Sequence, residues 1–298
     1  MSRPFPFYLV AAFSKGPFQG NPAAVVFIDE DLGTDTLMKV AVNFNQPMTS
    51  VIGSPIPSTD EKVAAWNIRW FSANSHEVPL CGHGTVAAAR AIFDSGLVAD
   101  SVEVVEFHTQ TAGVMKARKV GKDGIEIRLP SATLTEVSAD ENPKIAAALA
   151  KAFGRDVAVK YVGAASGGKG FESYLVVELD EQENLGKCDV NVPAFLDTGY
   201  VTNVITAAAS SGEELFVSRM FAPQILPPPF SEDSVCGSAH ALLAPYWSKK
   251  SGLAPDQPFS AKQVSSRGGD LGLTWDQTGG VVALTAATFV MSKGEIYL

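Results

Sequence analysis

The sequence is poor in cysteine, in positive charge and in long apolar runs, and each scarcity excludes a class of protein. Three cysteines occur in 298 residues, which is too few, and an odd number, for a disulfide-stapled scaffold. Lys and Arg number 23 against 32 Asp and Glu, a formal net charge of −9, and no basic run is present to bind nucleic acid or an anionic membrane. No apolar stretch approaches the roughly 18 residues that span a bilayer. We therefore expect free thiols in a cytoplasmic protein with neither nucleic-acid nor membrane partners.

Apolar residues, in contrast, are abundant enough for a large folded core. They make up 46% of the chain and charged residues 18%, which argues against disorder. The length suits one large domain or two of ordinary size. Strand-like and helical segments do not alternate as βαβ units would, which favours mixed or antiparallel sheets. We expect an α+β protein with one unit that extends to about residue 130 and a second that follows it.

Two of the three cysteines have repeated surroundings. PLCGHGTVAAA (79–89) places Cys81 before glycines, a histidine and an alanine-rich helix, and DSVCGSAHALLA (233–244) places Cys236 in a similar order. A helix N-terminus has unpaired N–H groups and partial positive charge, which stabilise an anion and lower the pKa of a cysteine there. Glycine lets a ligand approach the backbone closely. The pattern predicts two activated thiols beside a bound carboxylate or phosphate.

One such element per domain suggests a site where two thiols act on one substrate. If the two elements face each other across a cleft, one group removes a C–H proton and the other delivers one to the opposite face. Cys188, in LGKCDVN, lacks this context, and we interpret it as a small hydrophobe. For His240 a structural and a catalytic role are equally compatible with the sequence. The histidines and cysteines show no tight metal spacing, so we expect no metal site.

Five stretches spread over nearly the whole length resemble the PhzF family of phenazine-biosynthesis-like proteins, which share the diaminopimelate epimerase fold. They are FQGNPAAVV (18–26), IRWFSANSHEVPLCGHGTVAAA (68–89), SRMFAP (218–223), EDSVCGSAHALLAPYW (232–247) and QVSSRGGDL (263–271). The resemblance implies two similar domains, residues 1–130 and 131–287, each a mixed, mostly antiparallel sheet wrapped around a central helix. It also implies an active site between the domains, a C-terminal strand (about 288–298) that returns to the first domain, and a homodimer.

The resemblance further implies an isomerase, epimerase or racemase that moves a proton on a small carboxylate- or carbonyl-containing metabolite without a cofactor. In PhzF the acid/base is a glutamate in a segment resembling NLSET. Here that segment reads NQPMT, so Met48 stands at the glutamate's position, and a thioether carries no proton. PhzF commonly has Thr where this chain has Cys236, whereas diaminopimelate epimerase and proline racemase use cysteines at both positions as the two bases. The chain therefore lacks the PhzF glutamate and has the racemase pair.

The candidate site residues come from the two Cys-Gly segments and from the stretches that resemble PhzF. The catalytic candidates are Cys81, Cys236, Asp233 and His83. The substrate-binding candidates are Asn21, Gln46, Met48, Gly82, Gly84, Gly237 and Ser238. Asp233 could orient His83, act as a base itself, or cap the helix that follows. The amides of Asn21 and Gln46 could bind polar groups of a substrate, but a turn or a structural contact is the favoured interpretation of each.

Three hypotheses for the function follow. The first is an isomerase with Cys81 and Cys236 as paired acid/base groups; a variant of it uses Asp233 and His83 for a double-bond shift and survives Cys236→Ala. The second is a non-catalytic ligand- or partner-binding protein on the same scaffold, because Met48 replaces the glutamate. The third is a redox sensor, in which the two thiols form a reversible disulfide.

Overall fold

The computed structural model describes residues 2–168, 170–226 and 228–298, and the chain divides into two compact units. Unit 1 comprises Met1–Arg128 and Leu284–Leu298, and unit 2 comprises Leu129–Ala283. Both units combine helices with sheets that contain parallel and antiparallel pairs. The α+β class predicted from the sequence is confirmed.

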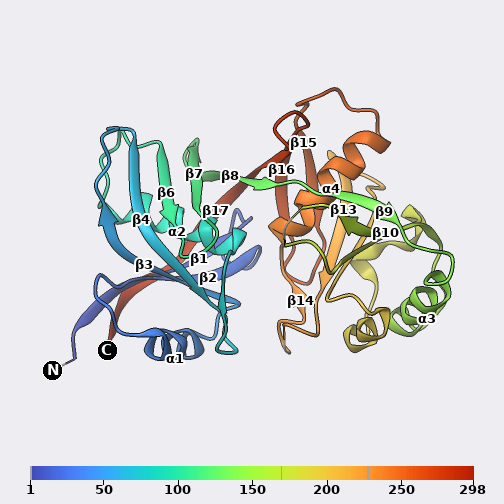
Figure 1. Cartoon of the computed structure of the whole chain (residues 1–298), viewed down its shortest axis with the longest axis horizontal. Coiled ribbons are helices and arrows are strands. Elements are labelled where there is room, and N and C mark those ends of the chain that lie inside the picture. The colour runs from blue at the N-terminus through green and yellow to red at the C-terminus, as the bar shows by residue number, and fades with distance from the viewer. Residues whose placement is uncertain (1, 169, 227) are drawn as a thin grey trace. The chain divides into compact units, whose positions relative to one another are not determined.

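Unit 1 is built from a closed sheet and two helices (Figure 1). Its elements are β1 (Pro4–Ala12), β2 (Asn21–Phe27), α1 (Thr34–Phe44), β3 (Met48–Ile56), β4 (Val63–Phe71), β5 (Glu77–Val78), α2 (Gly82–Ser95), β6 (Val104–His108), β7 (Val114–Val120), β8 (Gly124–Pro130) and the C-terminal part of β17 (Val281–Tyr297). The strands pair in the order β1-β2-β3-β4-β6-β7-β8-β17, and β17 pairs with β1, which closes the sheet. Closure removes the exposed sheet edges that would otherwise pair with other chains.

Helix α2 is apolar on most of its sides because strands surround much of it. It contacts β1, β2, β3 and β7. Ala87, Ala88 and Ala89 are each 0% exposed, and such small side chains let strands approach the helix axis closely. Helix α1, in contrast, buries one stripe, Leu37, Val40 and Ala41, in a cluster with residues of β1 to β4, as expected for an amphipathic surface helix.

Unit 2 contains a second mixed sheet with two helices (Figure 1). Its elements are β9 (Thr133–Glu136), α3 (Asn142–Phe153), β10 (Val159–Ser166), β11 (Tyr174–Leu179), the 3₁₀ turns η1 (Glu181–Glu183), η2 (Leu185–Lys187) and η3 (Val192–Thr198), β12 (Thr202–Ala208), β13 (Glu214–Phe221), β14 (Glu232–Asp233), α4 (Gly237–Lys250), β15 (Phe259–Gln263) and β16 (Gly269–Asp276). The strands pair in the order β9-β10-β11-β12-β13-β15-β16. Helix α4 contacts β9, β13 and β16, and α3 packs on η3.

The same order of elements leads to a cysteine in each unit. In unit 1, β4 is followed by the two-residue β5 antiparallel to it, by α2, and by β6 parallel to β4. In unit 2, β13 is followed by the two-residue β14 antiparallel to it, by α4, and by β15 parallel to β13. Cys81 and Cys236 are the N-caps of these two helices, each 14 residues long. Each thiol is thus held between a short strand and the first turn of a helix.

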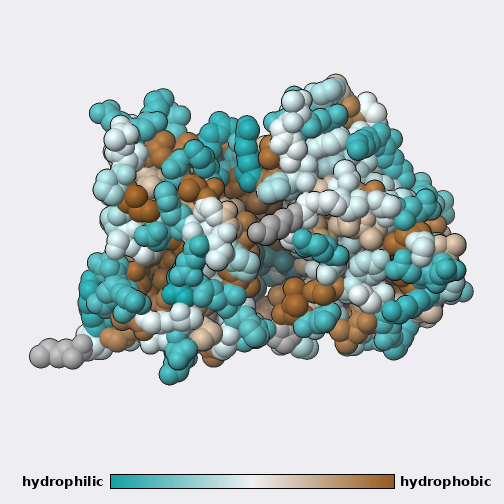
Figure 2. Space-filling model, in the orientation of Figure 1, coloured by the Kyte–Doolittle hydropathy of each residue, from teal (hydrophilic) through white to brown (hydrophobic). Residues whose placement is uncertain are grey.

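Figure 2 shows hydrophilic side chains over much of the drawn face of each unit, with apolar patches among them. Strand β17 leaves unit 2 and pairs antiparallel with β1 from Tyr297 opposite Pro4 to Thr288 opposite Ala12. Among the described residues, the helices are all too short or too polar to cross a membrane.

Candidate functional site

Cys81 lies, as the sequence predicts, at the N-terminus of α2. Its backbone is extended, and its Sγ accepts a hydrogen bond from the N–H of Gly84 at 3.4 Å. Its carbonyl accepts from the N–H and the Oγ1 of Thr85 at 3.0 and 2.6 Å. The residue is 8% exposed. The thiol therefore caps the helix, a role usually filled by an oxygen-bearing side chain.

His83 lies beside this thiol, and one of its ring nitrogens has no partner. Its Nδ1 is 3.4 Å from Cys81 Sγ. Burial lowers the pKa of His83 to about 4, so the imidazole is neutral at pH 7. Within the described part of the chain, no hydrogen-bond partner reaches the buried Nε2 of His83, nor Thr49 Oγ1 or Trp70 Nε1 in the adjacent strands β3 and β4. A thiol and a buried imidazole with an unused ring nitrogen thus stand together at one helix end.

At Gly84, α2 packs tightly against strands β3 and β4 of unit 1. A Cβ at this position would lie 2.8 Å from Cδ1 of Trp70 and 2.9 Å from Oγ of Ser50. Ser50 Oγ also donates a hydrogen bond to the carbonyl of Gly84 at 3.0 Å. Packing of α2 therefore requires glycine at position 84, whatever a ligand requires of it.

We expect Gly84→Ala to destabilise the protein by about 1–3 kcal/mol, because an added methyl group in a packed core forces neighbouring groups to move. Urea unfolding followed by far-UV circular dichroism measures this change. Gly16→Ala is the matched control, since no atom lies within 4 Å of a Cβ built at Gly16, and its stability should stay within ~1 kcal/mol of the parent. Equal midpoints for the two variants would contradict this reading of Gly84.

Three further predicted residues of unit 1 lie at one end of β2 and β3. Asn21 begins β2 and is 1% exposed, and Met48 begins β3 and is 7% exposed. The parallel pairing of Ala23 with Met48 places Asn21 and Gln46 at the same end of the two strands. The amide of Gln46 donates to the carbonyl of Phe44 at 3.1 Å, a turn contact. Position 48, where the resemblance to PhzF places a glutamate, holds a buried thioether.

Cys236 is the N-cap of α4 in unit 2, but its thiol is not activated in the way the sequence predicts. Its Sγ accepts from the N–H of Ala239 at 3.5 Å and lies 3.2 Å from the Oγ of Ser238. Burial, together with the nearby charge of Asp233, raises the pKa of Cys236 to about 12. The hydrogen bonds from Ser238 and from the helix N–H groups lower it by less. The expectation of a lowered pKa is therefore wrong for Cys236, because desolvation outweighs the helix end.

We expect this burial to make Cys236 slow to alkylate. A pKa of about 12, against a usual value of 9.0, leaves roughly 10³-fold less thiolate at pH 8. In native protein treated with iodoacetamide and analysed by mass spectrometry, Cys236 should react at least 100-fold more slowly than the half-buried Cys188. In guanidinium-denatured protein the two rates should converge. Equal rates in the native state would show that Cys236 is open and ionised.

His240 has a structural role, which settles the alternative that the sequence leaves open. Its Nδ1 lies 2.7 Å from the carbonyl of Cys236, and its Nε2 lies 3.2 Å from the Oγ of Ser218. A carbonyl only accepts, so Nδ1 carries the hydrogen and Nε2 accepts from Ser218. The residue is 0% exposed, and burial lowers its pKa to about 4. Both ring nitrogens are thus occupied in supporting the turn that begins α4.

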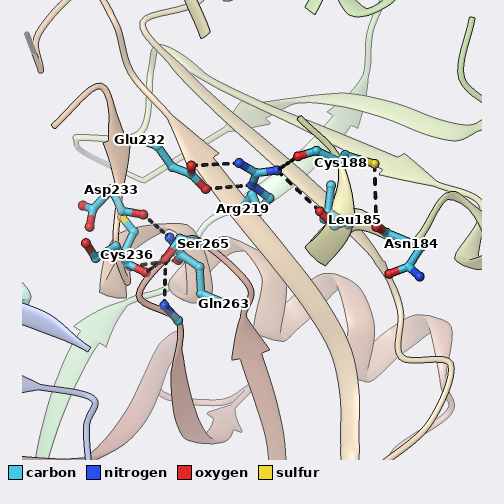
Figure 3. Close-up of polar contacts among 11 residues, drawn as sticks. Asn184, Leu185, Cys188, Arg219, Glu232, Asp233, Cys236, Gln263 and Ser265 are labelled. Carbon is cyan, nitrogen blue, oxygen red and sulfur yellow. Dashed lines mark hydrogen bonds and ion pairs between the residues drawn. The ribbon is translucent and has the colours of Figure 1, made fainter. Parts of the chain in front are cut away.

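Asp233 does not cap α4, because Cys236 holds that position. Its Oδ1 accepts from the N–H of Val235 at 3.1 Å, a turn ahead of the helix. A buried side chain missed by the sequence analysis fixes the same turn: Gln263 Oε1 accepts from the N–H of Cys236 at 2.9 Å, and its Nε2 donates to the carbonyl of Asp233 at 2.5 Å (Figure 3). Ser265 Oγ donates to the carbonyl of Ser234 at 2.6 Å. Strand β15 and the loop after it thus fix the segment that carries Asp233 and Cys236.

An arginine–glutamate pair anchors the short strand before each cysteine. Nε and Nη2 of Arg219 donate to the two carboxylate oxygens of Glu232 at 2.7 and 2.8 Å, and Nη1 donates to the carbonyl of Cys188 at 2.6 Å (Figure 3). In unit 1, Nε and Nη2 of Arg69 donate to Glu77, both at 2.7 Å. The signal is present in the sequence: a glutamate stands four residues before each cysteine, and IRWF and SRMF place an arginine two residues before a phenylalanine.

The remaining predicted residues lie in the first turns of the two helices. Gly82 and Gly237 are the first residues of α2 and α4, and Ser238 follows Gly237. Cys81, Cys188 and Cys236 are all present as thiols rather than as disulfides. In the portion of the chain described above, no group of three or more His, Cys, Asp or Glu side chains is placed to hold a metal ion.

Comparison with known proteins gives these elements a context. The family model described as phenazine biosynthesis-like protein matches residues 10–290. An uncharacterized isomerase of Halalkalibacterium halodurans is 31% identical over 268 residues, which cover 89% of each chain. The crystal structure of a PhzF-family phenazine biosynthesis protein from Enterococcus faecalis superposes with a TM-score of 0.81 at 29% identity and covers all of both chains. A hydroxyproline epimerase from Agrobacterium vitis has the same fold at a TM-score of 0.61 and 13% identity, over 99% of this chain and 92% of that one. Because the family model matches residues 10–290, nearly the whole chain, the chain belongs to the phenazine biosynthesis-like (PhzF) family.

Proposed function

We propose that this protein is an isomerase that transfers protons on a small carboxylate- or carbonyl-containing metabolite, with Cys81 and Cys236 as its two acid/base groups. The proposal is supported by the naming of a relative as an isomerase and by the fold shared with an epimerase. It also includes the substrate contacts with Gly82, Gly84, Gly237 and Ser238 that the sequence suggests. Each unit supplies one of the two thiols, Cys81 at the start of α2 and Cys236 at the start of α4.

The observation that carries the proposal is the pair of Cys81 and His83. A buried polar atom without a partner costs about 1–3 kcal/mol, so the unpartnered Nε2 of His83 needs a compensating role. With Nδ1 facing the thiol at 3.4 Å, a neutral ring carries its hydrogen on Nε2 when Nδ1 accepts from the S–H. A substrate carboxylate or enolate oxygen can accept from that Nε2–H. The same ring then binds the substrate and orients the thiol that acts on it.

The proton steps balance without a cofactor. Cys81 gives its thiol proton to Nδ1 of His83 and takes the proton from the substrate C–H. Cys236, which its raised pKa keeps protonated at neutral pH, donates its proton to the opposite face of the substrate carbon. Solvent then removes the extra proton from His83 and returns one to the Cys236 thiolate. The carboxylate of Asp233 disfavours the Cys236 thiolate, and the helix N–H groups favour it.

One observation favours a second candidate, a non-catalytic binding protein. The position of the family's acid/base glutamate is occupied by Met48, which is 7% exposed and has no proton to transfer. In that case the helix ends bind a ligand, and both cysteines are dispensable.

The family resemblance also supports a homodimer, which light scattering after size-exclusion chromatography would test.

Deuterium uptake tests the proposal even while the substrate is unidentified. The protein is incubated in D₂O with a panel of α-amino acids, cyclic imino acids, 2-hydroxy acids and unsaturated carboxylic acids, and the mixtures are analysed by NMR. We expect enzyme-dependent exchange of an activated C–H in one chemical class, together with inversion or a shifted double bond. A panel member that binds, as judged by calorimetry, yet never exchanges would favour the binding protein.

A further inference from the structure

A hydrogen-bond chain leads from the Cys236 thiol through Ser238 to the phenol of Tyr174. Cys236 Sγ is 3.2 Å from Ser238 Oγ, and Ser238 Oγ is 2.8 Å from the phenol oxygen of Tyr174. Tyr174 is the first residue of β11, and it pairs with Thr202 of the neighbouring strand β12. The first link joins a thiol to a hydroxyl and the second joins two hydroxyls, and in each link either group can be the donor. Tyr174 was not a candidate from the sequence.

We propose that Tyr174 is a positioning residue for Cys236: through Ser238, its hydroxyl completes a chain that hydrogen-bonds both the thiol and the thiolate. This inference rests on the proposed function, in which Cys236 gives up its proton and regains it in each turnover. Each protonation state of a buried sulfur needs its own hydrogen-bond arrangement. A chain of two hydroxyls supplies both arrangements by rotation of the O–H bonds alone.

The two arrangements differ by one proton, which Cys236 gives to the substrate carbon, while Ser238 and Tyr174 each keep their own. In the thiol state Cys236 S–H donates to Ser238 Oγ, and Ser238 O–H donates to Tyr174. When the thiol proton goes to the substrate carbon, both hydroxyls rotate. Tyr174 O–H then donates to Ser238 Oγ, and Ser238 O–H donates to the thiolate. The tyrosine stays protonated throughout, because burial and the charge of Cys236 both raise the pKa of its phenol.

Hydrogen bonds to an ionised acceptor are about twice as strong as neutral ones, and each donor in a chain strengthens the next. The chain therefore stabilises the thiolate more than the thiol. It opposes two effects that disfavour the thiolate, the burial of Cys236 and the carboxylate of Asp233. The other group that touches this turn, His240, is neutral and bonded to Ser218, so it contributes no charge.

The test is the alkylation rate of Cys236 by iodoacetamide between pH 7 and 10, which requires no substrate. We expect Tyr174→Phe to lower this rate three- to ten-fold at every pH, and Ser238→Ala to lower it ten-fold or more. Tyr200→Phe is the matched control: it removes a phenol of the same unit that contacts Glu141 instead, and it should leave the rate unchanged. Cys188, measured in the same digests, reports any general loosening of unit 2.

A faster alkylation of Cys236 in Tyr174→Phe would overturn the inference. If Tyr174 only packs the turn, Tyr174→Phe exposes Cys236 and its alkylation becomes faster, and an unchanged rate in Tyr174→Phe is equally fatal, whatever Ser238→Ala does. Should Tyr174→Phe fail to fold, Tyr174→Leu makes the same test, since it also removes the hydroxyl; Ser238→Ala reports the direct contact with the thiol. Because the readout is thiol reactivity, a protein without exchange activity can still show the chain, and failure of the chain leaves the two-thiol proposal standing.

Discussion

Replacement of either Cys81 or Cys236 by alanine is expected to slow inversion of the substrate by 10²–10⁴-fold, the usual contribution of a positioned acid/base group. In a two-thiol reaction each cysteine serves one face of the carbon. A single variant should therefore still exchange deuterium into the stereoisomer whose C–H faces the remaining thiol, but it should no longer convert that isomer into the other. Chiral chromatography and NMR in D₂O measure the two processes separately.

The control for this experiment is Cys188→Ala. Cys188 donates its S–H to the carbonyl of Glu183 at 3.2 Å, and we give it no role in the proton transfers, so both inversion and exchange should persist. Full activity in Cys236→Ala would instead favour the variant in which Asp233 and His83 carry out a double-bond shift. If Cys81→Ala and Cys236→Ala bind a ligand as the parent does and no variant ever exchanges hydrogen, the protein is a binder on this scaffold.

The local parts of the candidate site were predictable from the sequence because short-range chemistry determines them. A cysteine followed by Gly and small residues before an alanine-rich segment indicates a helix start, and both α2 and α4 begin at the following glycine. The mixed sheets could also be predicted, since apolar segments alternate too irregularly with helices for a parallel fold. The first turn of each helix is determined by the residues within it.

The parts that sequence could not supply depend on contacts between distant residues. The raised pKa of Cys236 results from its burial in the folded unit together with the charge of Asp233, and no local pattern predicts that this burial outweighs the helix end. Tyr174 reaches Ser238 from 64 positions away, and Gln263 reaches Cys236 from 27. The Arg219–Glu232 pair leaves a signal in the sequence, because the spacing of Glu232 from Cys236 is repeated by Glu77 and Cys81, but that spacing does not identify the arginine that pairs with each glutamate.

Arg219→Met is expected to destabilise the protein by about 3–5 kcal/mol, the usual cost of leaving one partner of a buried ion pair uncompensated. The side chains of Arg219 and Glu232 are 10% and 18% exposed. Removal of the guanidinium leaves the Glu232 carboxylate without its partner and the Cys188 carbonyl without the donor at 2.6 Å. Urea unfolding followed by circular dichroism measures the loss.

Arg69→Met provides a matched control from unit 1. Arg69 makes the same two-pronged pair with Glu77 and, like Arg219, lies over a phenylalanine, at 4.9 Å from Phe71 against 5.0 Å from Phe221. Its pair is more exposed, 21% and 29%, so water compensates the remaining carboxylate and the cost should fall to about 1 kcal/mol. Equal losses in the two variants would mean that stacking on phenylalanine, rather than the buried charge, sets the cost.

The double variant Arg219→Met/Glu232→Gln separates charge from packing within unit 2. Neutralising Glu232 removes the unpaired charge, so the double variant should recover about half of the loss of stability or more, while any contribution from the stacking on Phe221 stays lost.

The Arg219–Glu232 pair also joins β13 to β14 directly before Asp233. If it holds that segment in place, Arg219→Met should raise the alkylation rate of Cys236, and the double variant, which lacks the two-pronged bond as well, should remain as reactive. Recovery of stability without recovery of the low reactivity would show that the ion pair positions the second thiol as well as stabilising the fold.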